Sequence, residues 1–413
     1  MEEENRQNED SPAPDPRRHI CVVSETYSPQ VNGVALTLGH LVKGLQALGH
    51  RVSIVRPRQH RSDGCGLDLS VTVVAGLPLP GYKGLQFGLP AGALLQQAWM
   101  RNRPDVVYVA TEGPLGWSAV GVARRLAIPV FSGFHTNFHS YSRYYRVGYL
   151  HSVVLRYLRW FHNRTRGTLV PSSDLRDRLQ TLGFKKVLCL GRGVDSQLFD
   201  PARRCGILRR QWGLGADDLA VVYVGRIAGE KNLSLALAAY GAIKQTVNSA
   251  RFIVVGDGPL RSSLQAQHPD FIFTGMQLGP QLATHYASAD LFLFPSETET
   301  FGNVVLEAMA SGLGVIAYDY AAARSHIANG ESGILVPLGD SKAFVAAALK
   351  LASQPEELKR VRRQARDYSR SIGWPRVVER FAALLNGNDD QVRGPLRSLV
   401  GGQKLATAAR GRI

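Results

Sequence analysis

Two glutamates, Glu299 and Glu307, stand with seven residues between them just after a hydrophobic run. The stretch PSETETFGNVVLEAMASG (295–312) contains both, together with a Phe-Gly pair and a run of small residues. We expect a strand, then a loop that holds Glu299, then a helix that carries Glu307. Carboxylates accept hydrogen bonds from vicinal hydroxyls such as those of a sugar or a ribose. The pair is therefore expected to contact different parts of one ligand. The alternative is that Glu299 caps the helix and Glu307 lies on the surface.

Cationic side chains follow another hydrophobic run, in the stretch GRIAGEKN (225–232). Arg226 can bind a diphosphate through two hydrogen bonds at once, and Lys231 can bind it as a point charge. The alternative is two solvated surface charges, but the position of both after a predicted strand favours the phosphate. The next run ends in GDGP, whose Gly256 and Gly258 allow a close backbone approach, although Gly-x-Gly alone is a weak signal.

Backbone amides at two predicted helix starts are further candidates for anion binding. The amides of Gly302, Asn303 and Val304 are expected at one start, and Asn32-Gly33 precedes the other. N–H groups at a helix start attract anionic or hydroxyl-rich groups. For Asn32-Gly33 the alternative is an ordinary turn.

The charge balance of the chain points to an anionic partner. The 413 residues include 49 lysines and arginines against 33 aspartates and glutamates, which gives a formal net charge of +16. Such a balance suits nucleic acid, an anionic membrane surface or a phosphorylated substrate. The four cysteines form no CxxC pair, so neither a zinc site nor a disulfide framework is indicated. No apolar run approaches the roughly 20 residues of a spanning helix. The polar, acidic N-terminus lacks the features of a signal peptide, so we expect a cytoplasmic protein.

Short apolar runs alternate with helical patterns along the chain, as in parallel βαβ units. The runs predict strands at 19–24, 51–55, 71–74, 105–110, 128–133, 167–171, 186–190, 220–225, 251–256, 271–275, 290–295, 314–318 and 333–337. Their apolar character suits strands that are covered on both faces. We therefore expect an α/β protein of two doubly wound domains, 18–197 and 198–370, with the ligand site in the cleft between them. Residues 1–17 are expected to be a disordered acidic tail, 371–387 a helix that packs back on the N-terminal domain, and 388–413 a basic flexible tail.

Together these residues resemble the retaining nucleotide-sugar glycosyltransferases of family 4, which have the GT-B fold. The matching stretches are NG (32–33), GRIAGEKN (225–232), GDGP (256–259) and SETETFGNVVLEAMASG (296–312). Three stretches of the first half are similar to the subgroup that glycosylates lipids: SETYSPQVNGVALTL, TEGPLG and FHTNFHSY. This subgroup comprises phosphatidylinositol mannosyltransferases, diacylglycerol glycosyltransferases and sulfoquinovosyl transferases.

The resemblance implies a role for each candidate residue. Arg226 and Lys231 would hold the donor diphosphate, and Glu307 the ribose hydroxyls. The hexose would be held by Glu299 together with the backbone of Phe301, Gly302, Asn303 and Val304. Gly33 would let a loop close over the phosphates, Gly258 would belong to the donor site, and Met276 would lie near the base. His135, in FHTNF, would lie near the sugar C6 and the acceptor; the alternative is a packed histidine.

In this family the transfer retains the anomeric configuration, and the leaving diphosphate is thought to help deprotonate the acceptor hydroxyl. The catalytic residues would then be His135, Arg226, Lys231 and Glu299, which position the reactants and stabilise charge. No Asp-x-Asp occurs in the sequence, so a metal-bridged diphosphate is not suggested. We expect neither a metal nor a cofactor besides the nucleotide-sugar co-substrate, GDP-mannose or UDP-glucose.

A long interval without acidic residues, from Gly113 to Ser173, interleaves arginines with aromatic residues. Such side chains suit a lipid headgroup region, where each basic residue near anionic lipid gains about 1 kcal/mol. RNA binding would use the same residue types, and a solvated basic face is the structural alternative. The family resemblance favours an anionic membrane surface and no nucleic acid. The candidate membrane and acceptor residues are Arg143, Tyr144, Tyr145, Arg146, Arg156, Arg159 and Trp160.

The leading hypothesis is a hexosyltransferase that moves mannose or glucose to a diacylglycerol- or phosphatidylinositol-type lipid acceptor and makes an α-glycolipid. It would be bound peripherally to the inner face of the cytoplasmic membrane. The alternatives are a glycosyltransferase of polysaccharide or lipopolysaccharide assembly, a GT-B sugar-nucleotide epimerase and, in another class, a catalytically silent nucleotide-sugar-binding module. The sequence leaves the oligomeric state open.

Overall fold

The computed structural model describes residues 17–28, 30, 32–59, 70–78, 86–135 and 148–387, without the side chains of 148–151. Contacts between residues divide the chain into two compact units. The N-terminal unit comprises Met1–Phe134, Arg156–Leu169 and Phe184–Lys186, and the C-terminal unit comprises His135–Leu155, Val170–Gly183 and Val187–Ile413.

The first sheet has the order β3-β2-β1-β6-β7-β8-β9, which places seven of the described strands side by side. Its strands are β1 (His19–Val23), β2 (Arg51–Pro57), β3 (Val71–Val74), β6 (Val106–Val109), β7 (Val130–Gly133), β8 (Thr168–Val170) and β9 (Val187–Cys189). β1 pairs in parallel with both β2 and β6, so the strand order reverses between β1 and β6. The helices along this half are α1 (Gly33–Ala47), α2 (Gly92–Arg101), α3 (Pro114–Arg125), α5 (Gly148–His162) and α6 (Ser173–Thr181).

The second sheet has the order β12-β11-β10-β13-β14-β15, with six of the described strands. Its strands are β10 (Ala220–Val224), β11 (Arg251–Val255), β12 (Ile272–Gly275), β13 (Leu291–Phe294), β14 (Gly314–Tyr318) and β15 (Ile334–Val336). β10 pairs in parallel with β11 and β13, and the order reverses between β10 and β13. The helices are η1 (Pro201–Arg203), α7 (Gly206–Gln211), η2 (Gly229–Lys231), α8 (Leu233–Thr246), α9 (Arg261–Gln267), α10 (Gly279–Ser288), α11 (Asn303–Ala310), α12 (Ala321–His326), α13 (Ser341–Ala352), α14 (Pro355–Arg370) and α15 (Trp374–Leu385).

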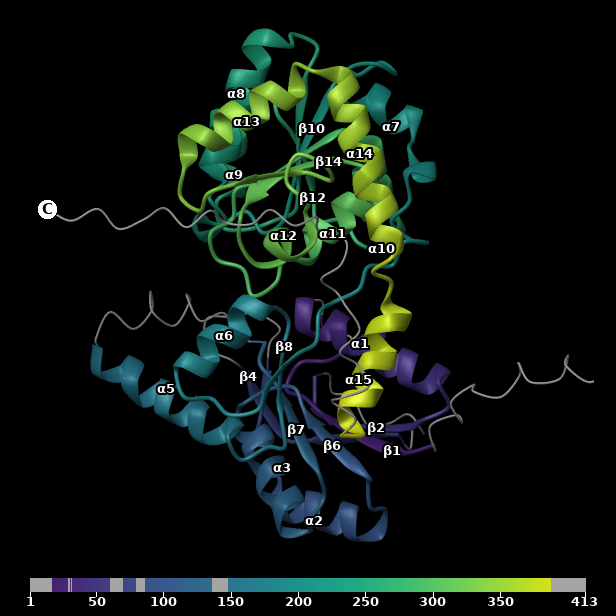
Figure 1. Ribbon diagram of the computed structural model, residues 1–413, viewed down its shortest axis with the longest axis vertical. Coiled ribbons are helices and arrows are strands. Elements are labelled where there is room, and N and C mark those ends of the chain that lie inside the picture. Colours follow the sequence, from purple (N-terminus) through teal and green to yellow (C-terminus); the bar gives the residue numbers. More distant parts are fainter. Residues whose placement is uncertain are drawn as a thin grey trace, which may run out of the picture. The chain divides into compact units, whose positions relative to one another are not determined.

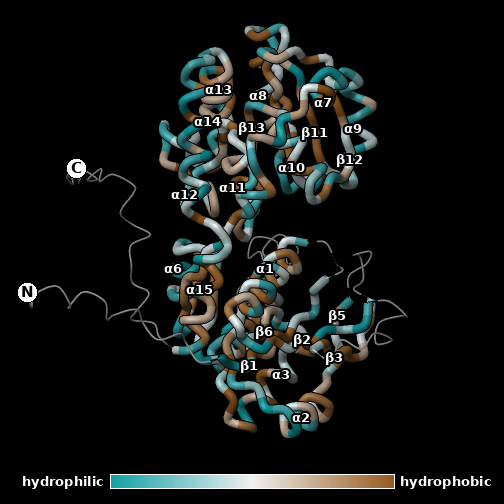
Figure 2. Tube along the Cα trace, turned by 90° about the vertical axis from the view of Figure 1, so that its right-hand side faces the viewer, coloured by the Kyte–Doolittle hydropathy of each residue, from teal (hydrophilic) through white to brown (hydrophobic). Residues whose placement is uncertain are grey.

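The second sheet separates two hydrophobic clusters, because successive side chains of a strand point to opposite faces. On β10, Val222 and Val224 belong to one cluster, and Val221 and Tyr223 belong to the other. The first cluster includes residues of α10 and α11, and the second includes residues of α8 and α13, two helices that lie side by side (Figure 1). Figure 2 shows hydrophobic residues along β11. Burial on both faces explains why these strands appear in the sequence as continuous apolar runs.

The structure confirms the predicted α/β class with two doubly wound sheets, and each predicted strand is present within one to two residues of its expected ends. Two short strands were missed, β4 (Gly76–Pro78) and β5 (Gln86–Gly88), which pair with each other in antiparallel fashion. Three-residue strands that contain glycine or proline carry no periodic pattern, so the sequence does not signal them.

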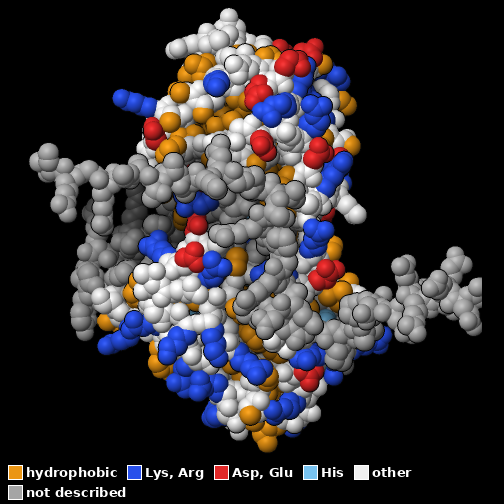
Figure 3. Space-filling model, in the orientation of Figure 1, with side chains coloured by type: hydrophobic (Ala, Val, Ile, Leu, Met, Phe, Trp, Pro, Cys, Tyr) orange, Lys and Arg blue, Asp and Glu red, His pale blue; other side chains and the backbone are white. Residues whose placement is uncertain are grey.

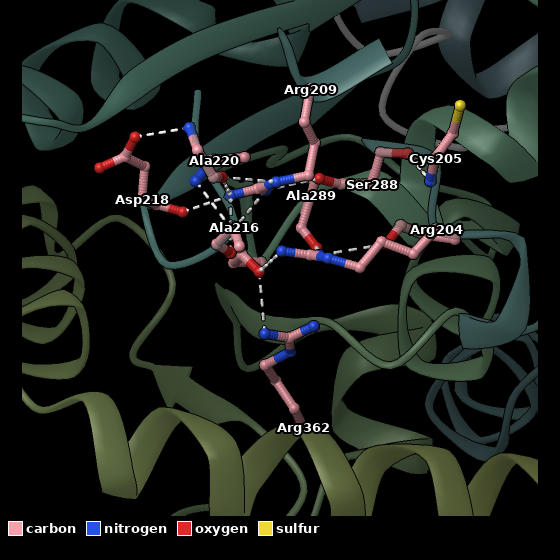
Figure 4. A network of polar contacts seen from close by, with 12 residues as sticks. Arg204, Cys205, Arg209, Ala216, Asp218, Ala220, Ser288, Ala289 and Arg362 are labelled. Atoms are coloured by element: carbon pink, nitrogen blue, oxygen red, sulfur yellow. Dashed lines mark hydrogen bonds and ion pairs between the residues drawn. The ribbon is translucent and has the colours of Figure 1, made fainter. Parts of the chain in front are cut away.

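A buried carboxylate joins several segments of the C-terminal unit. Asp290, just before β13, lies 3.0 Å from Arg204 Nη2, 3.1 Å from Arg209 Nη1 and 2.9 Å from Arg362 Nη1. Its Oδ2 also accepts a hydrogen bond of 2.9 Å from the amide of Ala220. Figure 4 shows Arg204, Arg209 and Arg362 converging on this network from different elements. Charged groups that are removed from water interact strongly, so the network fixes α7 and α14 against the amino end of the sheet.

Candidate active site

The strand order of the second sheet points to its ligand site. In open parallel sheets, ligands bind beyond the carboxyl ends of the strands at the point where the order reverses. Here that point lies between β10 and β13. The loop after β10 contains Arg226 and Lys231, and the loop after β13 contains Glu299. Residues that are far apart in sequence are thus brought to one edge of one sheet.

Lys231 and Glu299 form an ion pair across these two loops. Lys231 Nζ donates to Glu299 Oε1 at 2.5 Å, and the two side chains are 21% and 13% exposed. The same oxygen accepts a hydrogen bond of 2.7 Å from the hydroxyl of Ser296. A pair that is largely removed from water interacts more strongly than a surface pair. The structure therefore excludes the interpretation of Lys231 as a solvated surface charge.

Further hydrogen bonds hold the loop after β13 in place. Thr298 donates its hydroxyl to the carbonyl of Glu230 at 3.0 Å, and Asn232 Nδ2 donates to Glu297 Oε1 at 3.2 Å. On its other side, the hydroxyl of Tyr320 donates to the carbonyl of Glu299 at 2.8 Å. The loop that carries Glu299 is consequently held from both neighbouring loops, and Lys231 and Ser296 hold its carboxylate.

The helix that carries Glu307 begins after a glycine in the left-handed region. Gly302 has φ 94° and ψ 62°, a conformation that favours glycine, and it precedes α11. No side-chain hydrogen bond caps this helix start, so Glu299 does not cap α11. The first amides of α11, including those of Asn303 and Val304, follow directly. They give the edge of the sheet the positive end of a helix dipole.

Glu307 lies on α11 beside a buried tyrosine. The hydroxyl of Tyr286, on α10, donates to Glu307 Oε2 at 3.2 Å. Glu307 keeps some accessible surface, yet the protein atoms around its carboxyl desolvate it and raise its pKa to about 7, although the Tyr286 hydrogen bond lowers it. The interpretation of Glu307 as an ordinary surface residue is therefore wrong. Its carboxylate is poised to gain from hydroxyl donors of a ligand.

Arg226 and Gly258 belong to adjacent loops. The Arg226 side chain is 58% exposed and lies 3.4 Å from Glu230 Oε1, an ion pair that contributes little in water. A Cβ at Gly258 would lie 2.3 Å from the carbonyl oxygen of Ile227, so the GDGP loop contacts the backbone of the loop after β10. The structure thus supplies one reason for the glycine: two loop backbones approach each other closely.

The remaining donor-site candidates lie on three different segments. Met276 follows β12 and is 63% exposed. Gly33 is the first residue of α1, whose N-cap Asn32 accepts hydrogen bonds from the amides of Val34 and Ala35. Phe301 is buried, and its carbonyl accepts a hydrogen bond of 2.8 Å from the amide of Ala322.

His135 follows β7 by sequence and is grouped by its contacts with the C-terminal unit. Its Nδ1 lies 3.4 Å from Nη2 of Arg192, a buried arginine. Arg192 Nη1 in turn donates to Asn303 Oδ1 at 3.4 Å. His135 is thus connected to the start of α11 through one side chain.

Three of the predicted membrane residues lie on α5. Arg156, Arg159 and Trp160 are exposed on this helix. The other four, Arg143, Tyr144, Tyr145 and Arg146, lie outside the described residues. Figure 3 shows basic side chains spread over the visible face of the N-terminal part of the chain, where acidic ones are sparse.

Sequence reasoning missed three residues of this site: Ser296, Tyr286 and Arg192. Ser296 stands beside the predicted loop, and its small hydroxyl gave no separate signal. Tyr286 is 21 positions before its partner Glu307. Arg192 is 111 positions before Asn303. Pairs at such separations depend on the fold and not on any local pattern.

The fold and the site together define a class of protein. HepE of Anabaena, solved in complex with UDP, matches with a TM-score of 0.71 at 18% identity, over 89% of this chain and 100% of that chain. The chain therefore has the GT-B fold, with two doubly wound sheets.

Two family models match the sequence: "Glycosyltransferase Family 4" over residues 31–198 and "Glycosyl transferases group 1" over residues 218–354. A GDP-mannose-dependent alpha-mannosyltransferase of Mycobacterium tuberculosis is 32% identical over 381 residues, which cover 91% of this chain and 97% of that protein. An alpha-monoglucosyldiacylglycerol synthase of Streptococcus pneumoniae is 29% identical over 312 residues, 72% of this chain and 70% of that protein. The chain belongs to glycosyltransferase family 4, a retaining family, and transfers a hexose from a nucleotide sugar.

None of the helices in the described part of the chain combines the length and the apolar composition that crossing a membrane requires. Over the same residues, no three His, Cys, Asp or Glu side chains gather into a possible metal site. Transfer without a metal stays a prediction.

Proposed function

We propose that this glycosyltransferase moves mannose or glucose from GDP-mannose or UDP-glucose to a lipid of the diacylglycerol or phosphatidylinositol type, at the inner face of the cytoplasmic membrane. The C-terminal half would bind the donor, and the N-terminal half, residues 18–197, would bind the acceptor. The observation that carries the lipid part of this proposal is the exposed face of α5.

On α5, large apolar side chains are exposed at helical spacing. Val153 and Tyr157 are each 37% exposed and Trp160 is 43% exposed. Positions three and four apart share one face of a helix. Tyr157 stacks on Trp160 with ring centroids 6.3 Å apart, and the guanidinium of Arg164 lies 4.7 Å from the centre of the Trp160 ring. This aromatic stripe with a cation at its end is suited to the boundary between headgroups and acyl chains.

Arg156 and Arg159 form an adjacent basic row on the same helix, and both are exposed. They are three positions apart, so their guanidinium groups are near neighbours that repel each other in the free protein. An anionic surface relieves this repulsion. At about 1 kcal/mol for each basic residue, removing both would weaken binding to anionic lipid roughly 30-fold.

The donor part of the proposal rests on the ion pair of Lys231 with Glu299 and on the desolvated carboxyl of Glu307. Lys231 and Arg226 would bind the diphosphate, Glu299 the hexose and Glu307 the ribose. Relatives support either donor: one is named for GDP-mannose and another for a glucosyl lipid product.

The test incubates the protein with radiolabelled GDP-mannose or UDP-glucose and vesicles that contain diacylglycerol or phosphatidylinositol. A labelled, chloroform-soluble product that carries an α-linked hexose is expected with one donor. Transfer only to a polysaccharide or lipopolysaccharide precursor would favour the second candidate, and donor binding with no transfer to any acceptor would favour a silent binding module. Either result would overturn the proposal.

A parallel flotation assay uses vesicles with and without phosphatidylglycerol. The double variant Arg156→Gln/Arg159→Gln should lose about 30-fold in partition to the anionic vesicles. The matched control, Arg203→Gln/Arg210→Gln, removes two exposed arginines from η1 and α7 and should leave partition unchanged. An equal loss of partition in both variants would show that the net charge of the protein, and not the position of the arginines on α5, determines binding.

A further inference from the structure

A buried arginine lies between His135 and the start of α11. Arg192 is 7% exposed and belongs to the segment that follows β9. One of its terminal nitrogens is 3.4 Å from His135 Nδ1, and the other donates to Asn303 Oδ1 at 3.4 Å. The carbon of its guanidinium lies over the ring of Phe301, 5.5 Å from the centroid. Each of these three residues is a candidate for the donor or acceptor site.

The backbone next to Arg192 is fixed by close packing. A Cβ at Gly193 would lie 2.6 Å from the amide nitrogen of Trp374, so only glycine fits there. The amide of Val194 donates to the carbonyl of Ile372 at 3.1 Å. Because its backbone is held by this packing and its guanidinium lies over the ring of Phe301, Arg192 is preorganised.

The chemistry of the guanidinium determines the proton position on His135. Arginine carries only donors, and it does not lose its proton in proteins. The hydrogen bond between Arg192 and His135 therefore requires Nδ1 to be the acceptor. In a neutral imidazole the proton then resides on Nε2. His135 is left with one N–H donor on the side of the ring away from Arg192.

The same guanidinium also orients Asn303. Because Nη1 donates to Oδ1, the amide oxygen of Asn303 faces Arg192 and its NH₂ group faces away. Asn303 is the first residue of α11, at the positive end of the helix dipole. A second positive charge beside that end is favourable only when an anion is present, which suits a site for a diphosphate.

We propose that Arg192 is a positioning residue of the transferase: it fixes His135 as the Nε2–H tautomer and turns the Asn303 amide so that both present N–H donors to oxygen atoms of the donor sugar and acceptor. This inference rests on the proposed function for what the donors contact. The tautomer itself is independent of that function and can be observed in the protein without any substrate.

The test labels the histidines of the full chain with ¹⁵N and records long-range ¹H–¹⁵N spectra, with His135→Gln to assign the signal. Wild type should show a protonated Nε2 and an unprotonated Nδ1 for His135. Arg192→Met, which keeps the length and removes the donors, should give a mixture of tautomers, and Arg192→Lys should retain part of the preference. A protonated Nδ1 in wild type, or an unchanged spectrum in Arg192→Met, would overturn the proposal.

Kinetics of transfer provide the second readout. Arg192→Met should lower kcat by about 100-fold, as expected when reacting groups are misplaced by about 1 Å, with little change in donor KM. Arg209→Met is the control, since Arg209 is also buried but contacts Asp290. It should lower the melting temperature and leave the His135 spectrum and kcat unchanged. If wild type transfers no sugar, the proposed function is wrong. The spectra still test whether Arg192 fixes the tautomer of His135.

Discussion

The replacement of Glu307 by glutamine measures how strongly the fold desolvates this carboxyl. Burial raises its pKa from the ordinary value of 4.5 to about 7. The folded protein then holds the proton more tightly than the unfolded chain. The contribution of this carboxyl to stability is therefore greatest at low pH, falls as the pH rises from about 4.5 to about 7, and levels off above that range. At about 1.4 kcal/mol per pH unit, the loss approaches about 3 kcal/mol.

Glutamine does not ionise, and its amide oxygen can still accept the hydrogen bond of Tyr286. We therefore expect Glu307→Gln to become more stable relative to wild type by about 2–3 kcal/mol between pH 5 and pH 8.5. Its affinity for the nucleotide sugar should fall at the same time, because a neutral amide is a weaker acceptor for ribose hydroxyls than a carboxylate. A variant that is more stable and binds less tightly is the expected sign of a binding-site residue.

Urea unfolding followed by circular dichroism at pH 5, 7 and 8.5 measures the first effect, and calorimetric titration with the nucleoside diphosphate measures the second. Glu379→Gln on α15 is the matched control, since Glu379 is exposed. It should show no pH-dependent difference from wild type. If the stability difference between Glu307→Gln and wild type were the same at all three pH values, the carboxyl would not be desolvated and the reasoning would be refuted.

Four other variants test the ion pair, the buried network and the loop contact. Lys231→Ala and Glu299→Gln should each lower kcat/KM at least about 100-fold in a glycosyl-transfer assay while the protein stays folded; unchanged transfer would show the site assignment to be wrong. Asp290→Asn should cost about 3–5 kcal/mol in urea unfolding, because buried arginines lose their counter-charge, and a loss below about 1 kcal/mol would contradict the network's role. Gly258→Ala should destabilise by about 1–3 kcal/mol through backbone overlap, whereas Gly241→Ala, which has open space in α8, should be neutral or stabilising by up to about 1 kcal/mol.

The strands were predictable because parallel strands buried on both faces consist of uninterrupted apolar residues. The same pattern shows where the loops begin, because Arg226, Lys231 and Glu299 are charged residues that follow the end of an apolar run. The sequence does not show which loops lie next to each other in the fold. Lys231 and Glu299 are 68 positions apart, and only the reversal of strand order between β10 and β13 brings them together.

The state of Glu307 was equally hidden, for a different reason. Its neighbours on α11 are apolar, which indicated a partly apolar setting, but desolvation depends on what covers the carboxyl from other elements. Tyr286 on α10 supplies that cover together with its hydroxyl. The two acids are accommodated in different ways: desolvation makes the charge of Glu307 costly, whereas Lys231 neutralises the charge of Glu299.

These two solutions have a common consequence for the donor. Lys231 and Glu299 neutralise each other at 2.5 Å, so each charge has a partner within the protein. With the proposed roles, a diphosphate that bound Lys231 would free the Glu299 carboxylate to accept hydrogen bonds from hexose hydroxyls. Ribose hydroxyls would likewise favour the charged form of Glu307. We therefore expect binding of one half of the donor to strengthen binding of the other, so that the whole nucleotide sugar binds more tightly than its separate nucleotide and sugar would indicate.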